Sequence, residues 1–262
     1  KELAVYKWMC ANIGFDDGSL AVIPDAGSEV DNPHGVLKYH KAVCVGYATT
    51  FRLFMQMMDI ECMVVHDSYL SHSWDLVKLD GQWYHTDIYS DAPDGNFSHF
   101  NLNDDAMMNM QDWNTDFFPA AEGYKYNYAY MQKVDCKDIY SIPGQLRAAI
   151  DAQKGVASFD LGKDISDDTY SILETIMNQV ENAVTSGSDK GVGITWSWLQ
   201  AGDDNVFCVY LNYEKETEDP DSNVDIDAET QQKIDEAVNK AFGNIGSDDV
   251  IIGGVSEKTV IS

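Results

Sequence analysis

The chain has 262 residues, of which 44% are hydrophobic and 11% aromatic, so it can build one large or two ordinary domains and is not disordered as a whole. Lys and Arg number 17 against 44 Asp and Glu, a net charge of −27 that repels phosphate backbones and anionic bilayer surfaces. We therefore expect no nucleic-acid partner. No apolar run approaches the roughly 18 residues that a spanning helix needs, and we expect no membrane insertion.

The first predicted elements are two helices with a long loop between them. Apolar residues lie along one side of a helix at 3–12, and Gly14 is expected to help end it. The segment 16–39 is rich in Gly, Asp, Asn and Pro, which predicts an irregular loop. A second helix is predicted at 44–58 from apolar residues at helical spacing. Cys44 would then lie in its first turn.

A buried strand at 61–66 and a β-hairpin are predicted next. The hairpin strands, at 71–79 and 82–89, are joined by Asp80-Gly81, a two-residue turn signal. Such a turn pairs Leu79 with Gln82, which places His72 and Asp87 on one face as diagonal neighbours, roughly 7 Å apart at the backbone. An imidazole and a carboxylate can meet across that distance. The alternative is an ordinary polar pair on a solvated face.

The aromatic run that follows has a strand-like period. Tyr124, Tyr126, Tyr128 and Tyr130 alternate with polar or small residues, which predicts one face of a strand. We expect this face to pack in a core or an interface; a sugar-stacking platform is the alternative.

A second, smaller domain is expected where the character of the chain changes, near Asp135. The expected elements are a helix at 142–152, a strand at 156–161, a helix at 168–185, strands at 192–199 and 206–213, an acidic stretch at 214–227, a helix reaching Phe242 and a strand at 250–255. Without the first helix the order is βαββαβ, which suggests a ferredoxin-like sandwich. The predicted fold class is α+β, with domains at 1–134 and 135–262.

Cys44, His72 and Asp87 offer the groups that cysteine catalysis requires. A helix N-terminus favours the thiolate of Cys44 and supplies backbone N–H groups for an oxyanion, while His72 is a candidate base and Asp87 its orienting carboxylate. Taken alone, a Cys at the start of a helix is more often a small buried residue. The combination of the three carries the hypothesis.

Three motifs in this order resemble a known family. They are Ala42-Val43-Cys44-Val45-Gly46-Tyr47-Ala48, His72-Ser73-Trp74-Asp75 and Gly81-Gln82-Trp83-Tyr84-His85-Thr86-Asp87. They resemble the nucleophile, base and acid motifs of the transglutaminase-like superfamily of papain-like cysteine enzymes, in its bacterial form, and the resemblance runs from about residue 1 to about residue 130.

The resemblance implies a catalytic domain in which the helix bearing the Cys packs on an antiparallel sheet. It implies Cys44 as nucleophile, His72 as general base and acid, and Asp87 as orienting carboxylate, with no cofactor. Two departures concern the acceptor side of the pocket: Asp75 stands where an Asn is common, and Ile88-Tyr89-Ser90 replaces the more usual Thr-Trp-Asp.

The resemblance predicts an amide hydrolase that acts on peptides, proteins or cell-wall peptides through an acyl-thioester on Cys44. The first alternative is transglutaminase-type acyl transfer, which uses the same residues and yields a crosslink. The second is a catalytically inactive surface binding or scaffold protein. Bacterial relatives of this kind are commonly exported, so a secreted or cell-surface protein is expected.

Other features of the sequence favour a cytoplasmic location or do not distinguish it from export. Five scattered cysteines fit a cytoplasmic location better, and the N-terminal residues carry no leader pattern, as in a cytosolic protein or one whose signal peptide has been removed. The oligomeric state is left open.

Three further hypotheses, a metal site at His85, a calcium site and a disulfide, have less support from the sequence. His85 could join Asp87 as a metal ligand, but no third ligand has the spacing of a zinc site. The acidic stretch at 214–227 could bind calcium, but it lacks the EF-hand pattern. A bridge between Cys10 and Cys62 is left open, since packed thiols are more common. His34, His40, His66 and His99 are expected to be solvated or locally hydrogen-bonded.

Overall fold

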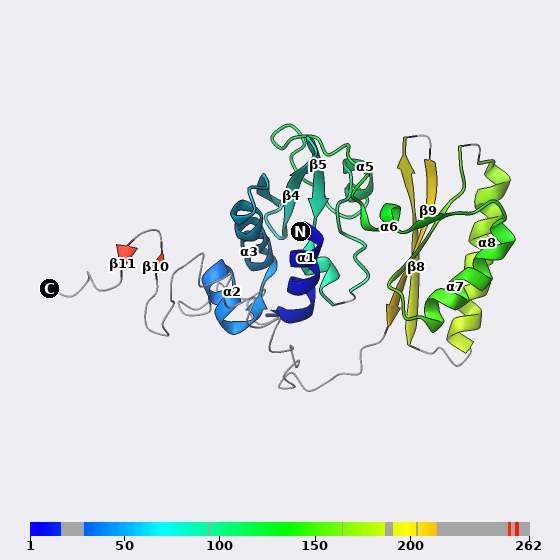
Figure 1. The fold of residues 1–262 in the computed structure, drawn as a ribbon, viewed down its shortest axis with the longest axis horizontal. Helices are drawn as coiled ribbons and strands as arrows, with labels where there is room; N and C mark the ends of the chain where they lie inside the picture. Colours follow the sequence, from blue (N-terminus) through cyan, green and yellow to red (C-terminus); the bar gives the residue numbers. More distant parts are fainter. Residues whose placement is uncertain are drawn as a thin grey trace. The chain divides into compact units, whose positions relative to one another are not determined.

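The computed structural model describes residues 1–16, 29–93, 95–163, 165–186, 191–202 and 204–213, and two short strands near the C-terminus (Figure 1). Lys1–Glu216 form one compact unit and Thr217–Ser262 a second. The acidic stretch at 214–227 and the helix expected up to Phe242 lie outside the described residues. Where one strand is expected at 250–255, β10 (Ile251–Ile252) and β11 (Val255–Ser256) pair antiparallel.

The first part of the larger unit combines helices with a three-stranded sheet. Its elements are α1 (Glu2–Asn12), β1 (Gly14–Phe15), α2 (Pro33–Tyr39), β2 (Lys41–Ala42), α3 (Cys44–Met57), β3 (Cys62–His66), β4 (Ser73–Leu79), β5 (Gln82–Thr86), α4 (Ile88–Asp91), α5 (Asp104–Met107) and α6 (Tyr128–Met131).

Two sequence expectations near the N-terminus are corrected. Helix α1 ends at Asn12, before Ile13, whose backbone is extended, and Gly14 instead begins β1, which pairs in parallel with β2. The segment expected to be all loop contains α2. The side chain of Asn32 caps α2 by accepting the Gly35 N–H, and Pro33 occupies the first turn, where its missing N–H costs nothing.

Helix α3 packs on one face of the sheet β3-β4-β5. Phe51 and Met55 of α3 share a buried cluster with Val77 of β4. The opposite face of the sheet buries Trp74 and Leu76 in a separate cluster. The helix that begins at Cys44 therefore lies on an antiparallel sheet, as expected for the α+β class.

The hairpin has the register deduced from the turn. Leu79 pairs with Gln82, and both turn residues adopt positive φ, 49° at Asp80 and 83° at Gly81, as a type I′ turn requires. The second strand is shorter than predicted. It ends at Thr86 because the side chain of Asp87 caps α4.

The tyrosine run is not a strand, which corrects the period-two prediction. Asn127 caps the short helix α6 by accepting the Tyr130 N–H. The tyrosine rings do not line one common face. Tyr128 contacts Phe97, whereas Tyr130 packs against Tyr124 and donates its hydroxyl to Asp204 at 3.0 Å.

A four-stranded sheet follows in the same unit. Its elements are β6 (Lys133–Asp135), the 3-10 turn η1 (Ile139–Ser141), α7 (Ile142–Asp151), β7 (Val156–Asp160), α8 (Asp167–Ser186), β8 (Val192–Ala201) and β9 (Asp204–Tyr213). The strand order is β6-β7-β9-β8, and α7 and α8 cover one face (Figure 1). The described elements run βαβαββ, so the ferredoxin-like order is not confirmed. From the strand at 156–161 onward, the predicted order is matched by β7, α8, β8 and β9; β6 is an additional strand, and the last predicted helix lies outside the described residues. The domain boundary predicted between residues 134 and 135 stays a prediction.

Among the described helices, none is long and apolar enough to cross a bilayer.

Candidate functional site

Cys44 is the first residue of α3, and its side chain is buried. The preceding residue, Val43, gives no side-chain cap, and its backbone N–H donates to the Val30 carbonyl at 3.1 Å. The first N–H groups of a helix have no acceptor inside the helix, and the helix dipole makes this end positive. The Cys44 sulfur therefore lies where negative charge is stabilised.

His72 comes from a closed loop between β3 and β4. Its backbone N–H donates to Asp67 Oδ1 at 3.0 Å, and the Asp67 N–H donates to the His72 carbonyl at 3.1 Å. Ser71 donates to both oxygens of the same carboxylate. Asp67 thus fixes the main chain on which the imidazole stands. The imidazole itself stacks on Trp74, with ring centroids 5.8 Å apart.

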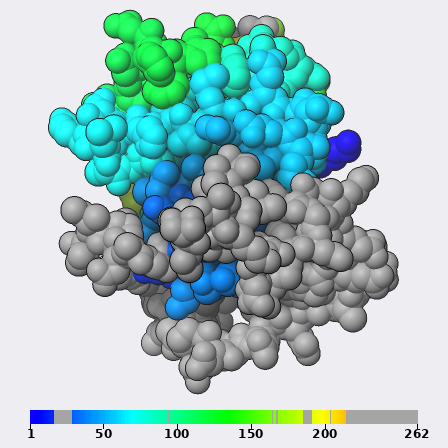
Figure 2. All heavy atoms as spheres, turned by 90° about the vertical axis from the view of Figure 1, so that its left-hand side faces the viewer, coloured from blue at the N-terminus to red at the C-terminus, as the bar shows by residue number. Residues whose placement is uncertain are grey.

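This loop adjoins the segment after α5. The Ser68 N–H donates to the Asp112 carbonyl at 2.9 Å, and the cyan and green parts of the chain meet on one face in Figure 2. Tyr69 and Leu70, at the tip of the loop, are 83% and 81% exposed. Tyr69 and Leu70 are therefore two large hydrophobic side chains exposed to solvent within three residues of His72.

Asp87 follows β5 and is 1% exposed. Its Oδ2 lies 2.7 Å from His72 Nε2 and accepts the Ser90 hydroxyl at 2.7 Å, while Oδ1 accepts the Ser90 N–H at 3.2 Å. The carboxylate is thus at once the cap of α4 and the partner of the imidazole. The role of Ser90 is not evident from the sequence, because a four-residue helix leaves no periodic signal.

The electrostatics favour a charged His72–Asp87 pair. Burial by itself lowers the pKa of His72, but hydrogen bonds to Asp87 and Cys44 outweigh it and raise the pKa to about 10. Burial raises the pKa of Asp87, yet the hydrogen bond and charge of His72, the charge of His99 and the Ser90 hydroxyl hold it below its ordinary value. At neutral pH the pair is imidazolium and carboxylate.

The structure brings Cys44, His72 and Asp87 together. An imidazolium donates from both ring nitrogens. Nε2 faces Asp87, so Nδ1 is the nitrogen left for the Cys44 side chain, which is a hydrogen-bond partner of His72. The arrangement can hold a thiolate beside a proton donor, with a carboxylate fixing the orientation of the ring.

His85 does not join this group. It is fully buried, its Nε2 lies 2.8 Å from Asp104 Oδ1, and its Nδ1 accepts the Trp74 indole N–H at 2.9 Å. Burial lowers the pKa of His85, so it is a neutral imidazole with both nitrogens engaged. The described residues include no group of three or more His, Cys, Asp or Glu that could hold a metal.

Asp75, the departure in the second motif, lies on the opposite face of β4 from Trp74. It is 1% exposed, and Cys62 Sγ donates to its Oδ1 at 3.4 Å. Burial raises the pKa of Asp75 well above its ordinary value. Burial therefore favours the neutral carboxyl group of Asp75, which is close in size and polarity to the amide of the more common Asn. No disulfide joins Cys62 to Cys10.

The remaining histidines fit the expectation of local hydrogen bonding, with one addition. His34 Nδ1 lies 2.8 Å from Glu29, and His66 Nδ1 lies 2.7 Å from Ser73 Oγ. His40 ends α2 at a positive φ of 54° and is exposed. His99 is different because it forms a second pair with the buried carboxylate of Asp91.

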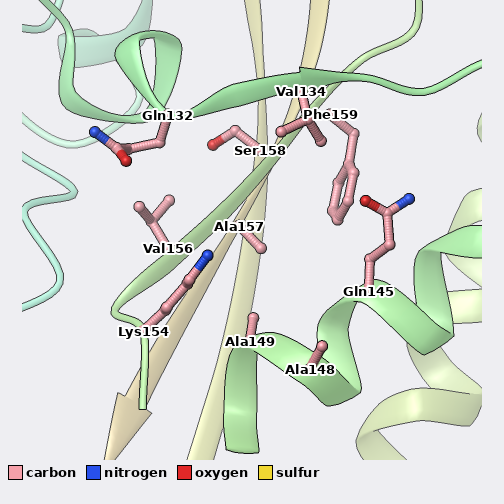
Figure 3. A pocket seen from close by; sticks show the side chains of 10 residues that line it. All are labelled: Gln132, Val134, Gln145, Ala148, Ala149, Lys154, Val156, Ala157, Ser158 and Phe159. Carbon is pink, nitrogen blue, oxygen red and sulfur yellow. The ribbon is translucent and has the colours of Figure 1, made fainter. Parts of the chain in front are cut away.

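A cavity of about 250 Å³ lies apart from this group, between β7 and α7 (Figure 3). Its lining residues include Val156, Ala149 and Gln145, and Lys154 lies at its edge. These side chains include no nucleophile beside a base. The chemistry of the described residues therefore points to Cys44 and His72 rather than to this cavity.

Comparisons with known proteins agree with the motifs. Residues 1–88, a range that holds Cys44, His72 and Asp87, match the family profile described as the transglutaminase-like superfamily. Kyphoscoliosis peptidase from Homo sapiens is 24% identical over 98 residues, which is 32% of this chain and 14% of that protein. A solved structure titled as a TGase is 20% identical with a TM-score of 0.30, covering 34% of this chain and 25% of its own. The chain thus spans only a small part of the length of the curated relative.

Proposed function

From the premise that residues 1–88 form a transglutaminase-like superfamily domain, we propose that this protein is a cysteine-dependent amide hydrolase acting on peptides or proteins. The observation that carries the proposal is the hydrogen-bonded series Cys44, His72 and Asp87, with His72 Nε2 2.7 Å from Asp87. Members of this superfamily are typically cysteine-dependent enzymes.

In the first half-reaction the Cys44 thiolate attacks the carbonyl carbon of an amide and a C–S bond forms. The backbone N–H groups at the start of α3 are placed to receive the oxyanion. His72 then transfers its Nδ1 proton to the leaving nitrogen, the C–N bond breaks and an amine departs. The product on the protein is an acyl-thioester, and His72 is left neutral.

In the second half-reaction neutral His72 takes a proton from water, which attacks the thioester carbonyl. The C–S bond breaks, a carboxylic acid leaves and the thiolate–imidazolium pair is restored. Asp87 keeps Nε2 protonated throughout, so that Nδ1 is the nitrogen that exchanges protons.

The same residues support acyl transfer if an amine replaces water. The name of the human relative, a peptidase, favours hydrolysis. The expectation of a peptide or cell-wall substrate outside the cell is part of this proposal and is supported only by the resemblance to exported bacterial relatives.

Alkylation of Cys44 tests the proposal without a known substrate. We expect brief treatment with iodoacetamide near neutral pH to modify Cys44 before the other cysteines, as read by peptide mass mapping. His72→Ala should remove this selectivity, and His85→Gln should keep it, because His85 is engaged with Asp104 and Trp74. Preferential modification of Cys136 or Cys208 would contradict the assignment.

A peptide library then separates the reactions. Incubation with and without an added primary amine, followed by mass spectrometry, shows a free acid for hydrolysis and a new amide for transfer. Turnover of neither kind, together with an unreactive Cys44, would favour the inactive scaffold.

A further inference from the structure

A second imidazole–carboxylate pair, His99 and Asp91, is hydrogen-bonded to the main chain of Asp87 through the His99 carbonyl. Asp91, one turn later in α4, is fully buried. Its Oδ1 lies 2.8 Å from His99 Nδ1 and accepts the Ser98 hydroxyl at 3.0 Å. Its Oδ2 accepts the His99 backbone N–H at 3.0 Å and the Tyr6 hydroxyl at 2.5 Å. A buried carboxylate is costly unless its oxygens are satisfied, and here both oxygens are.

The residues that gather on Asp91 also hold the main chain of Asp87. The Asp87 N–H donates to the His99 carbonyl at 3.1 Å, and the Tyr6 hydroxyl lies 2.9 Å from the Asp87 carbonyl oxygen. The single Tyr6 hydroxyl proton is shared between Asp91 Oδ2 and the Asp87 carbonyl, so both backbone polar groups of Asp87 contact residues that meet at one carboxylate. The backbone of Asp87 is therefore held by contacts separate from those of its carboxylate with His72 and Ser90.

The charges around His99 complete this arrangement. Burial lowers the pKa of His99, but the hydrogen bond to Asp91 and the charges of Asp91 and Asp87 outweigh it, while the charge of His72 opposes them. The net pKa of His99 is raised, which favours its cationic form beside Asp91 and Asp87. On the α1 side, Tyr6 contributes its hydroxyl, and Lys7 Nζ lies 5.2 Å from the Phe97 ring centroid.

We propose that Tyr6, Asp91 and His99 form a clamp that positions Asp87 and places a positive charge beside it. The inference rests on the proposed function and assigns these three as positioning residues, which act on the reaction through Asp87. A role limited to folding would alter stability alone. A positioning role also alters the pH range over which Asp87 can support the thiolate–imidazolium pair.

The first test measures the rate of Cys44 alkylation by iodoacetamide in the full chain from about pH 4.5 to about pH 9, a range that spans the ordinary carboxyl and imidazole pKa values. His99→Gln removes the positive charge near Asp87, so the acid-side midpoint of the profile should move up by on the order of 1 pH unit. His99→Arg keeps the charge and should restore the midpoint. A His99→Gln midpoint within about 0.2 pH unit of the unsubstituted protein overturns the proposal.

The second test removes a contact and leaves the charge. Tyr6→Phe should lower the alkylation rate about fivefold or more at every pH, about 1 kcal/mol, without moving the midpoint. Tyr47→Phe is the matched control, since its buried hydroxyl donates to the Ile13 carbonyl at 2.5 Å and not to Asp87. A Tyr6→Phe rate within about twofold of the Tyr47→Phe rate overturns the clamp. If circular dichroism shows that His99→Gln does not fold, the comparison of Tyr6→Phe with Tyr47→Phe tests the clamp alone.

The two proposals can fail separately. If His72→Ala and Asp87→Asn abolish selective alkylation of Cys44 while the Tyr6 and His99 variants behave as the unsubstituted protein, only the clamp is wrong. If His72→Ala and Asp87→Asn leave the alkylation of Cys44 unchanged, the proposed function is wrong and the clamp is overturned with it.

Discussion

His72 Nε2 and Asp87 Oδ2 lie 2.7 Å apart although neither residue belongs to a strand. His72 immediately precedes β4 and Asp87 immediately follows β5, so the register of the hairpin between them sets their separation. A slip of one residue would turn Asp87 to the other face. The turn at the far end of the hairpin therefore matters to the candidate site.

The first prediction concerns that turn. Gly81 has φ 83°, and a Cβ added there meets no atom within 4 Å, so Gly81→Ala suffers only backbone strain. We expect a loss of about 1 kcal/mol in the free energy of unfolding by urea. Gly144, in α7, also faces open space but lies outside the left-handed region, and Gly144→Ala should gain about 0.5–1 kcal/mol. Equal effects of the two substitutions would contradict the backbone argument.

The hairpin and the helix carrying Cys44 could be predicted because their signals are local. Asp80-Gly81 specifies a turn type, and that turn fixes which residues pair. The clamp could not be predicted, because Tyr6 and Asp91 meet only through tertiary packing of α1 on α4. Nothing in the spacing of His99 distinguishes it from a solvated histidine.

The errors have equally local causes. Gly, Asn and Pro at 16–39 predict a loop, but Asn32 followed by Pro33 is also a helix-start signal, and α2 begins there. The period of two in the tyrosine run predicts a strand, but the Asn127 cap outweighs that period over so short a segment.

The second prediction concerns pH. The pKa of His72 is raised to about 10 from an ordinary value of 6.5, so the folded protein retains a proton that the unfolded chain loses between these values. Stability from this group is complete below about pH 6.5 and is lost as the pH rises toward about 10. The free energy of unfolding should fall across this range more steeply for the unsubstituted protein than for His72→Gln. If the free energy of unfolding measured with urea falls equally steeply with pH for the unsubstituted protein and for His72→Gln, the raised pKa of His72 is contradicted.

The third prediction concerns Asp75, whose pKa burial raises well above 3.8. The unfolded chain ionises Asp75 at lower pH than the folded protein, so stability is lost as the pH rises above the ordinary carboxyl value. Asp75→Asn removes this loss. Near pH 8 it should add about 1 kcal/mol or more, roughly 2–4 °C in melting temperature, with a smaller gain near pH 4. A gain that is the same at both pH values would exclude titration as its cause.

The last prediction concerns Asp87 itself. If Asp87 orients the imidazole and stabilises its charged form, Asp87→Asn should keep the fold and the substrate affinity but lower turnover of a peptide amide by about 10² to 10⁴. The amide of Asn can accept from Nε2–H or donate to a deprotonated Nε2, so the ring is no longer held in one tautomer. Asp104→Asn is the matched control, because Asp104 pairs with His85 at 2.8 Å in the same way but outside the candidate site. Turnover should fall only in the Asp87 variant, and turnover retained within about threefold, under about 1 kcal/mol, would show that Asp87 does not serve His72 in catalysis.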